Sequence, residues 1–202
     1  MDIIDEGLRN PPEIGDFGAA FNDPKIISRA QSQSARKNPA WKKSLVSSMR
    51  KYGFELVGAG FNGAVFQNPN YPFVIKVYRK DEGYDEWLHF SRTHSSNRFV
   101  PKFRGETIIV NDIFRAVRLE PLISCPNESA CDFIDMVEQV KNISWNRSTE
   151  LPDDHDLVEV SSFMREWEQA SDLTPHNVMC RADGQVVIID PVCISPGQIL
   201  DW

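Results

Sequence analysis

A short polar loop late in the chain carries the residue types that phosphoryl transfer needs. Asp172 and Asn177 bracket a segment containing Pro175, which predicts a rigid loop, not a helix. The carboxylate can orient or deprotonate a hydroxyl, while the amide oxygen can reach a metal ion. Asp190 closes the apolar run 186–189, so its carboxylate is expected at a strand end. Because Mg²⁺ prefers a few protein oxygens together with phosphates and waters, Asn177 and Asp190 are the predicted ligands.

These two aspartates also have simpler interpretations. Asp172 can be a turn or helix-cap aspartate, and Asp190 can be a turn aspartate before Pro191. Each alternative is reasonable by itself. Both together, at these spacings, would be a coincidence, so we interpret the pair as one site.

A glycine-rich turn lies upstream. Gly58, Gly60 and Gly63 have the spacing G-x-G-x-x-G, and Val65 follows. A dinucleotide-binding turn of this spacing must open a helix, but two prolines within nine residues of Gly63 exclude a helix of useful length. Strand, glycine turn and strand therefore predict a hairpin whose backbone can close over phosphates. A glycine-rich hairpin without a ligand is the alternative for this motif alone.

Lys76 interrupts the apolar strand predicted at 73–78. A lysine in such a run is costly to bury unless it is paired. Phosphate oxygens and a carboxylate would supply the pairing, with Glu86 on the next helix as the best candidate and Glu82 or Asp85 as alternatives. The competing interpretation is a lysine that faces solvent on an edge strand.

The remaining pattern predicts an α+β chain, rich in strands first and helical afterwards. Helices are expected at 39–52, 83–95, about 128–143 and about 156–170, and strands at 54–57, 64–66, 73–78, 107–110 and 115–119. Residues 1–35 predict an extended or partly disordered arm. The basic residues of the first helix form either a docking surface for an acidic partner or a solvated helix face.

Composition narrows the functional class. A net charge of −7 argues against nucleic-acid or membrane-surface binding, and no apolar run approaches the roughly 18 residues of a membrane span. The start of the chain has no signal-peptide pattern. The four cysteines make no CxxC pair and the four histidines make no HExxH motif, so reduced thiols in a cytoplasm are expected.

Together these blocks resemble the protein-kinase-like superfamily over roughly residues 54–192. The glycine turn and Val65 match its G-x-G-x-x-G-x-V loop, Lys76 its strand-three lysine, and Asp190 the aspartate of D-F-G. The segment from Asp172 to Asn177 matches D-L-x-x-x-N. The resemblance further implies an adenine-binding hinge that includes Glu120 and Leu122, with ATP and Mg²⁺ as cofactors.

Three blocks, the glycine loop, V-I-K-V and I-D-P-V, are more narrowly similar to the early serine/threonine kinase of short-tailed bacteriophages. That family phosphorylates host proteins and helps to shut off host transcription. The resemblance implies a two-lobed fold. An antiparallel-sheet N-terminal lobe with a leading amphipathic helix is expected at 36–121, and a truncated helical C-terminal lobe with the catalytic loop at 122–202.

The chain also departs from the kinase pattern. Ala170 and Ser171 replace the His and Arg before the catalytic aspartate, and Thr174 replaces a lysine beside the transferred phosphate. Twelve residues follow Asp190, which leaves no room for an activation segment or for helices that dock a peptide. The nucleotide half is expected to be complete and the substrate half reduced.

The leading hypothesis is ATP- and Mg²⁺-dependent phosphoryl transfer to protein Ser/Thr, autophosphorylation included, by a phage early protein in the host cytoplasm. Host bacterial proteins are then the substrates, with no direct contact to nucleic acid or membrane. The alternative is a weak or inactive kinase-like protein, a pseudokinase, that binds and inhibits a host target such as RNA polymerase. A small-molecule phosphotransferase is a third hypothesis, because aminoglycoside-type kinases share the D-x-x-x-x-N loop.

Overall fold

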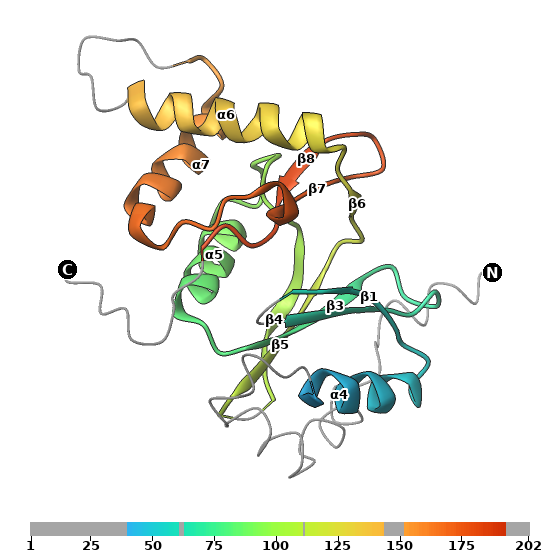
Figure 1. Cartoon of the computed structure of the whole chain (residues 1–202). Coiled ribbons are helices and arrows are strands. Elements are labelled where there is room, and N and C mark those ends of the chain that lie inside the picture. Colours follow the sequence, from blue (N-terminus) through green and yellow to red (C-terminus); the bar gives the residue numbers. More distant parts are fainter. Residues whose placement is uncertain (1–39, 61–62, 111, 144–151, 193–202) are drawn as a thin grey trace. The chain divides into compact units, whose positions relative to one another are not determined.

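A computed structural model describes residues 40–60, 63–110, 112–143 and 152–192 of the chain (Figure 1). The predicted arm at 1–35 lies outside these residues. The chain divides into two compact units, one formed by Met1–Lys80 with Arg104–Glu120 and the other by Asp81–Phe103 with Pro121–Trp202. In the part of the chain that is described, no helix is long and apolar enough to cross a membrane.

The first unit is built on a five-stranded sheet with the order β1-β2-β3-β5-β4. The strands are β1 (Glu55–Ala59), β2 (Gly63–Gln67), β3 (Val74–Arg79), β4 (Phe103–Ile109) and β5 (Phe114–Leu119). The pairs β1–β2, β2–β3 and β3–β5 are antiparallel. The structure thus confirms the predicted strands, with β4 extending further toward its N-terminus than the pattern indicated.

One face of this sheet is covered by helix α4 (Ala40–Arg50), as Figure 1 shows. Leu45 and Met49 lie one turn apart on α4 and are 1% and 0% exposed. They pack into a core with alternate residues of β2 and β3, among them Phe66 and Ile75. Burial of this stripe explains why a helix forms at the predicted place, because a short helix depends on packing more than on propensity.

Lys76 lies on the opposite face of the same sheet, because side chains alternate along a strand and both Ile75 and Val77 belong to the α4 core. Strand β3 lies between β2 and β5, with Lys76 paired to Val65 on one side and to Val117 on the other. The lysine is only 8% exposed. The alternative of a solvent-facing lysine on an edge strand is therefore wrong.

The second unit combines three helices with a small sheet. The helices are α5 (Glu82–Thr93), α6 (Asn127–Ile143) and α7 (His155–Glu166). The sheet has the order β6-β7-β8, with β6 (Ile123–Ser124), β7 (Val178–Cys180) and β8 (Val186–Ile188). The predicted helices are confirmed, although the last ends at Glu166 and continues as a 3-10 turn, Glu168–Ala170.

Caps and aromatic rings fix the helices of the second unit. Asp81 caps α5 by accepting a hydrogen bond from the backbone N–H of Tyr84 at 3.2 Å. The ring of Trp87 packs against Phe163 of α7, with the centroids 5.2 Å apart, and Phe90 contacts the same ring at 4.7 Å. Helix α5 therefore packs on α7, although the two are far apart in sequence.

Candidate active site

The side chain of Asn177 is anchored directly on Asp172. Its Nδ2 donates one hydrogen bond to the backbone oxygen of Asp172 at 2.7 Å and a second to Oδ2 of the same residue at 3.0 Å. The loop between them is short and turns at Pro175, which opens the 3-10 helix Pro175–Asn177. The predicted loop is present, and its two polar ends are hydrogen-bonded to each other.

Asp190 is held beside this loop by its two chain neighbours. The backbone N–H of Asp172 donates to the oxygen of Pro191 at 2.7 Å, and the N–H of Ile189 donates to the oxygen of Asn177 at 2.9 Å. An isolated antiparallel bridge between Ser171 and Val192 extends the pairing. The segment that carries Asp190 is thus hydrogen-bonded to both ends of the loop, at Asp172 and at Asn177. Three residues selected from sequence spacing are brought together in one unit.

The donor set of this cluster fits a magnesium ion. The amide nitrogen of Asn177 is occupied by Asp172, so the oxygen Oδ1 is the atom of this side chain that can bind a cation. Asp190 adds a half-buried carboxylate and Asp172 an exposed one. Hard oxygen ligands of this kind, few in number, are what Mg²⁺ takes from proteins.

Tyr84 is an electrostatic neighbour of Asp190 that sequence reasoning missed. Burial raises the pKa of the Tyr84 hydroxyl well above its usual value, and the negative charge of Asp190 raises it further. Asp85 acts in the same direction, whereas Arg92 opposes it. Helix α5 therefore places a neutral phenol close to the predicted metal ligand. The sequence carried no signal for this, because the proximity arises from packing between distant segments.

In the first unit, the glycine loop and Lys76 meet at Gly63. A Cβ atom at Gly63 would lie 3.1 Å from the backbone oxygen of Val77 and 3.5 Å from Cε of Lys76. A side chain at this position would therefore crowd the neighbouring strand β3, which glycine avoids. A Cβ at Gly60 would meet nothing within 4 Å, and one at Gly58 would make only ordinary contact with Val65.

The remaining predicted residues are distributed over both units. Lys76 lies in the first unit and Glu86 in the second, where it is exposed on α5. Their pairing stays a prediction. Glu120 is the last residue of the first unit, and Leu122 follows where the chain has entered the second. Both are half-buried, and their role as a hinge for adenine is likewise a prediction.

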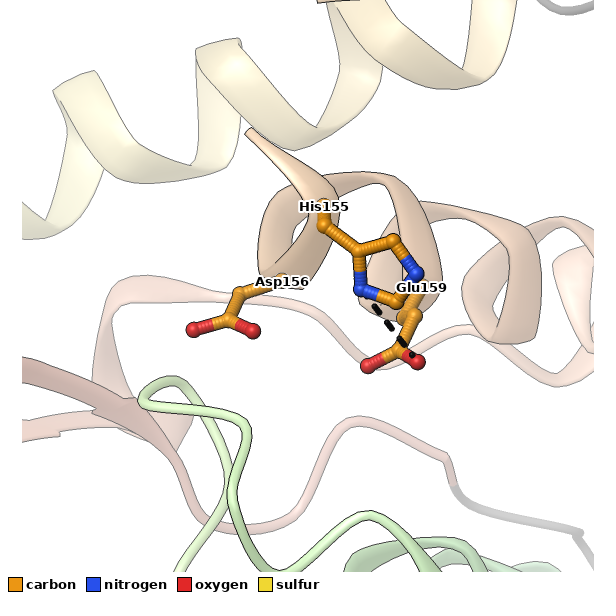
Figure 2. A group of neighbouring side chains, drawn as sticks. All are labelled: His155, Asp156 and Glu159. Carbon is orange, nitrogen blue, oxygen red and sulfur yellow. Dashed lines mark ion pairs between the residues drawn. The ribbon is translucent and has the colours of Figure 1, made fainter. Parts of the chain in front are cut away.

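A further polar cluster lies at the start of α7, where the sequence suggested no metal motif. His155, Asp156 and Glu159 each offer a ligand atom within 4.8 Å of the others. Figure 2 shows the ion pair between Nδ1 of His155 and Oε1 of Glu159, which are 3.5 Å apart. The spacing of the two on one helix face could have revealed this pair.

The carboxylates of this cluster already have protein partners. Asn97, which is 2% exposed, donates through Nδ2 to Oε2 of Glu159 at 3.0 Å. Arg98 pairs with Oδ2 of Asp156 at 3.4 Å, and Nε2 of His94 lies 3.9 Å from Oε1 of Glu159. We interpret the group as a polar network that joins α7 to the segment after α5. These protein partners argue against a metal site here.

Comparison with protein families identifies the chain. Residues 22–201 match the family described as bacteriophage T7 protein kinase 0.7. The chain belongs to this family. Among individual curated proteins, none matches the sequence. Membership agrees with the resemblance to phage early kinases that the glycine loop, Lys76 and Asp190 indicated. It also points to protein kinase activity in a phage protein, and a kinase uses ATP and, in the known classes, Mg²⁺.

Proposed function

We propose that this protein transfers the γ-phosphoryl group of ATP to serine or threonine hydroxyls of proteins, itself included. The observation that supports this most directly is the hydrogen-bonded cluster of Asp172 and Asn177 with the segment of Asp190. Family membership supports the reaction class.

In this proposal the second unit supplies the acid–base and metal-binding groups. Asp172 orients the attacking hydroxyl and accepts its proton, held in place by the amide of Asn177. The oxygens of Asn177 and Asp190 would hold Mg²⁺. When bound, this ion neutralises charge on the phosphate oxygens. The half-buried setting of Asp190 limits competition from water.

The first unit would supply the groups that bind phosphate and adenine. Lys76 is a buried cation next to the last glycine of the loop, with Cε 3.5 Å from the place of a Cβ at Gly63, and it would bind the phosphates. Glu86 would orient Lys76, and Glu120 and Leu122 would contact adenine. On this proposal the chain forms the two lobes of a protein-kinase-like fold, expected at 36–121 and 122–202. The observed units differ from these ranges, because Asp81–Phe103, which includes α5, belongs to the second unit.

The departures at Ala170, Ser171 and Thr174 fit a kinase that needs no phosphorylated activation loop. Ala170 is 4% exposed and closes the 3-10 turn before the loop, so it is a packing residue here. The proposed substrates are host bacterial proteins in the infected cytoplasm, including components of host transcription. The match to a bacteriophage kinase family supports this setting.

The test is transfer of label from γ-labelled ATP, with Mg²⁺, to the protein itself and to a bacterial lysate. Asp172→Asn keeps the size of the residue but removes its charge, and we expect it to abolish labelling. Asp135→Asn is the matched control, because Asp135 is an exposed aspartate on α6. Equal labelling by Asp172→Asn and the native chain would refute the assigned role. Labelling of added sugars or antibiotics, with no labelled protein, would favour a small-molecule phosphotransferase.

A second candidate function is inhibition of a host protein by binding. It is favoured by the exposed basic residues Lys43, Arg50 and Lys51 at α4, which a nucleotide site does not require. Pull-down from host lysate with Lys76→Ala and Asp172→Ala separates the two proposals. A stoichiometric complex that survives both substitutions and is lost on charge reversal at Lys43 and Lys51 would support binding. Dependence of capture on ATP would argue for the kinase.

A further inference from the structure

Two cysteines that are far apart in sequence lie side by side in the small sheet of the second unit. Sγ of Cys180 is 2.7 Å from Sγ of Cys125. Cys180 ends β7 and pairs with Ile123 of β6, and Cys125 follows β6 directly. Cys125 is thus two positions beyond the partner of Cys180, on the same face of the sheet. Both side chains are aimed at each other across the strand pair.

The separation of the sulfurs is close to that of a disulfide. A disulfide bond is about 2.04 Å long, so the two sulfurs need to approach by less than about 1 Å to reach it. The strands that carry them are held in register by the pairs Ile123–Cys180 and Ser124–Met179. Formation of the bond therefore requires little movement of the backbone.

The two thiols differ in access, which defines their order of reaction. Cys125 is partly exposed, whereas Cys180 is only 4% exposed. A reagent in solution reaches Cys125 first, and Cys180 is placed to attack the product. Burial and the neighbouring Cys180 thiol together raise the pKa of Cys125 to about 11. Its thiolate is therefore scarce at neutral pH, and the pair stays reduced unless an oxidant is supplied.

We infer that Cys125 and Cys180 are a site of reversible disulfide formation with low-molecular-weight disulfides as the oxidant class. The Cys125 thiolate attacks one sulfur of the reagent RSSR, forms a mixed disulfide and releases one RSH. Cys180 then attacks the Cys125 sulfur, and the second RSH leaves. Two protein thiols are oxidised and one external disulfide is reduced to two thiols. This inference does not depend on phosphoryl transfer.

The bond would act on the strand that leads out of the loop of Asp172. Strand β7 begins at Val178, directly after Asn177, and pairs with β8, which leads to Asp190. A covalent link from β7 to Cys125 would restrain local opening of these strands. The backbone amides of β6 and β7 are therefore expected to exchange with solvent more slowly in the oxidised protein.

The experiment treats the full native chain with oxidised glutathione, blocks remaining thiols by alkylation and maps peptides without reduction. We expect one cross-linked peptide pair containing Cys125 and Cys180, two hydrogens lighter than the reduced pair. Its rate of formation should rise about tenfold per pH unit below the pKa of Cys125. Added dithiothreitol should restore both free thiols, and hydrogen exchange of β6 and β7 should slow only in the oxidised sample.

Cys131→Ser is the matched control, because Cys131 is also a partly exposed free cysteine of the same unit. This variant should form the cross-link as the native chain does, whereas Cys125→Ser should leave Cys180 unmodified. Persistent glutathione adducts on Cys125 without a cross-link would overturn the inference. So would a cross-link from either cysteine to Cys131 or Cys193. The native chain alone decides these outcomes, so they hold even if a variant folds poorly.

Discussion

The amide of Asn177 donates to both the backbone oxygen and the carboxylate of Asp172, at 2.7 and 3.0 Å. The amide nitrogen of Asn177 thus fixes the position of the predicted base, and its amide oxygen is the predicted Mg²⁺ ligand. In the proposed mechanism the two tasks depend on each other. A change at Asn177 will therefore alter more than metal binding.

Substitution of Asn177 can separate these tasks. Asn177→Ala removes the donor and the oxygen, and we expect phosphoryl transfer to fall by about 10²-fold or more. Asn177→Asp keeps an oxygen for Mg²⁺ but cannot donate to Asp172, so activity should also fall while the Mg²⁺ requirement stays closer to native. The measurement is initial rate against Mg²⁺ concentration. His176→Ala, at the exposed neighbour, is the control, and native rates in Asn177→Asp would contradict the positioning role.

The glycine loop offers a matched pair of substitutions. Gly63→Ala brings a methyl group to 3.1 Å from the backbone oxygen of Val77, whereas Gly60→Ala meets nothing within 4 Å. The oxygen of Val77 belongs to a central strand and yields little, so we expect Gly63→Ala to have a lower free energy of unfolding than Gly60→Ala. Gly60→Ala should change it little. Chemical denaturation of both variants measures the difference.

Nucleotide binding by the same two variants tests the proposed loop. Gly63→Ala should also weaken ATP binding, because the added methyl lies next to Lys76. If both variants bind ATP as the native chain does, the glycine spacing has a structural role only. Equal destabilisation by the two alanines would contradict the packing argument.

The sequence could predict which residues lie close together where they are near in the chain or where strand pairing joins them. Asp172 and Asn177 are five positions apart, so one turn at Pro175 brings them together. Burial of Lys76 could be predicted because its neighbours in the strand are apolar on both sides. The proximity of Tyr84 to Asp190 and of Cys125 to Cys180 could not be predicted. Each depends on which distant segments pack together, and a single sequence does not show that.

Tyr84 should make stability sensitive to alkaline pH. Its pKa is raised in the folded protein, so the unfolded chain loses the phenolic proton first, near its ordinary pKa of about 10. The unfolded state therefore binds fewer protons above that pH, and the free energy of unfolding falls as pH rises. Tyr84→Phe removes this contribution and should give a shallower fall. Denaturant unfolding at a series of pH values up to about 11 measures both slopes; parallel slopes would contradict the prediction.

The network at the start of α7 should be structural and independent of metal. Asn97 donates to the backbone oxygen of Asp156 at 2.8 Å and to Glu159, and its own oxygen accepts from the N–H of Phe99 at 2.9 Å. Asn97→Ala leaves these groups without that partner, at a cost of about 1–3 kcal/mol per unsatisfied group. Ser96→Ala, at an exposed neighbour, should cost little.

A chelator separates this network from a metal centre. We expect the melting temperature of the native protein to be the same with and without EDTA, since the carboxylates of Asp156 and Glu159 are already bound by Arg98 and Asn97. A fall in melting temperature on chelation that is restored by one divalent metal would show that the protein binds that metal. Loss of the effect in His155→Ala would then locate the ion.

The chain passes between the two units after Lys80, after Phe103 and after Glu120. Within the second unit, helix α5 precedes α7 by about sixty residues, so it is synthesised well before α7. Phe163 of α7 covers Trp87 and Phe90 of α5. At ribosomal rates of about 5–20 residues per second, this delay is on the order of seconds. For that time the aromatic face of α5 is without its native cover and open to chaperones. A stalled or truncated nascent chain ending before α7 should be captured by such factors, whereas the completed protein should escape them.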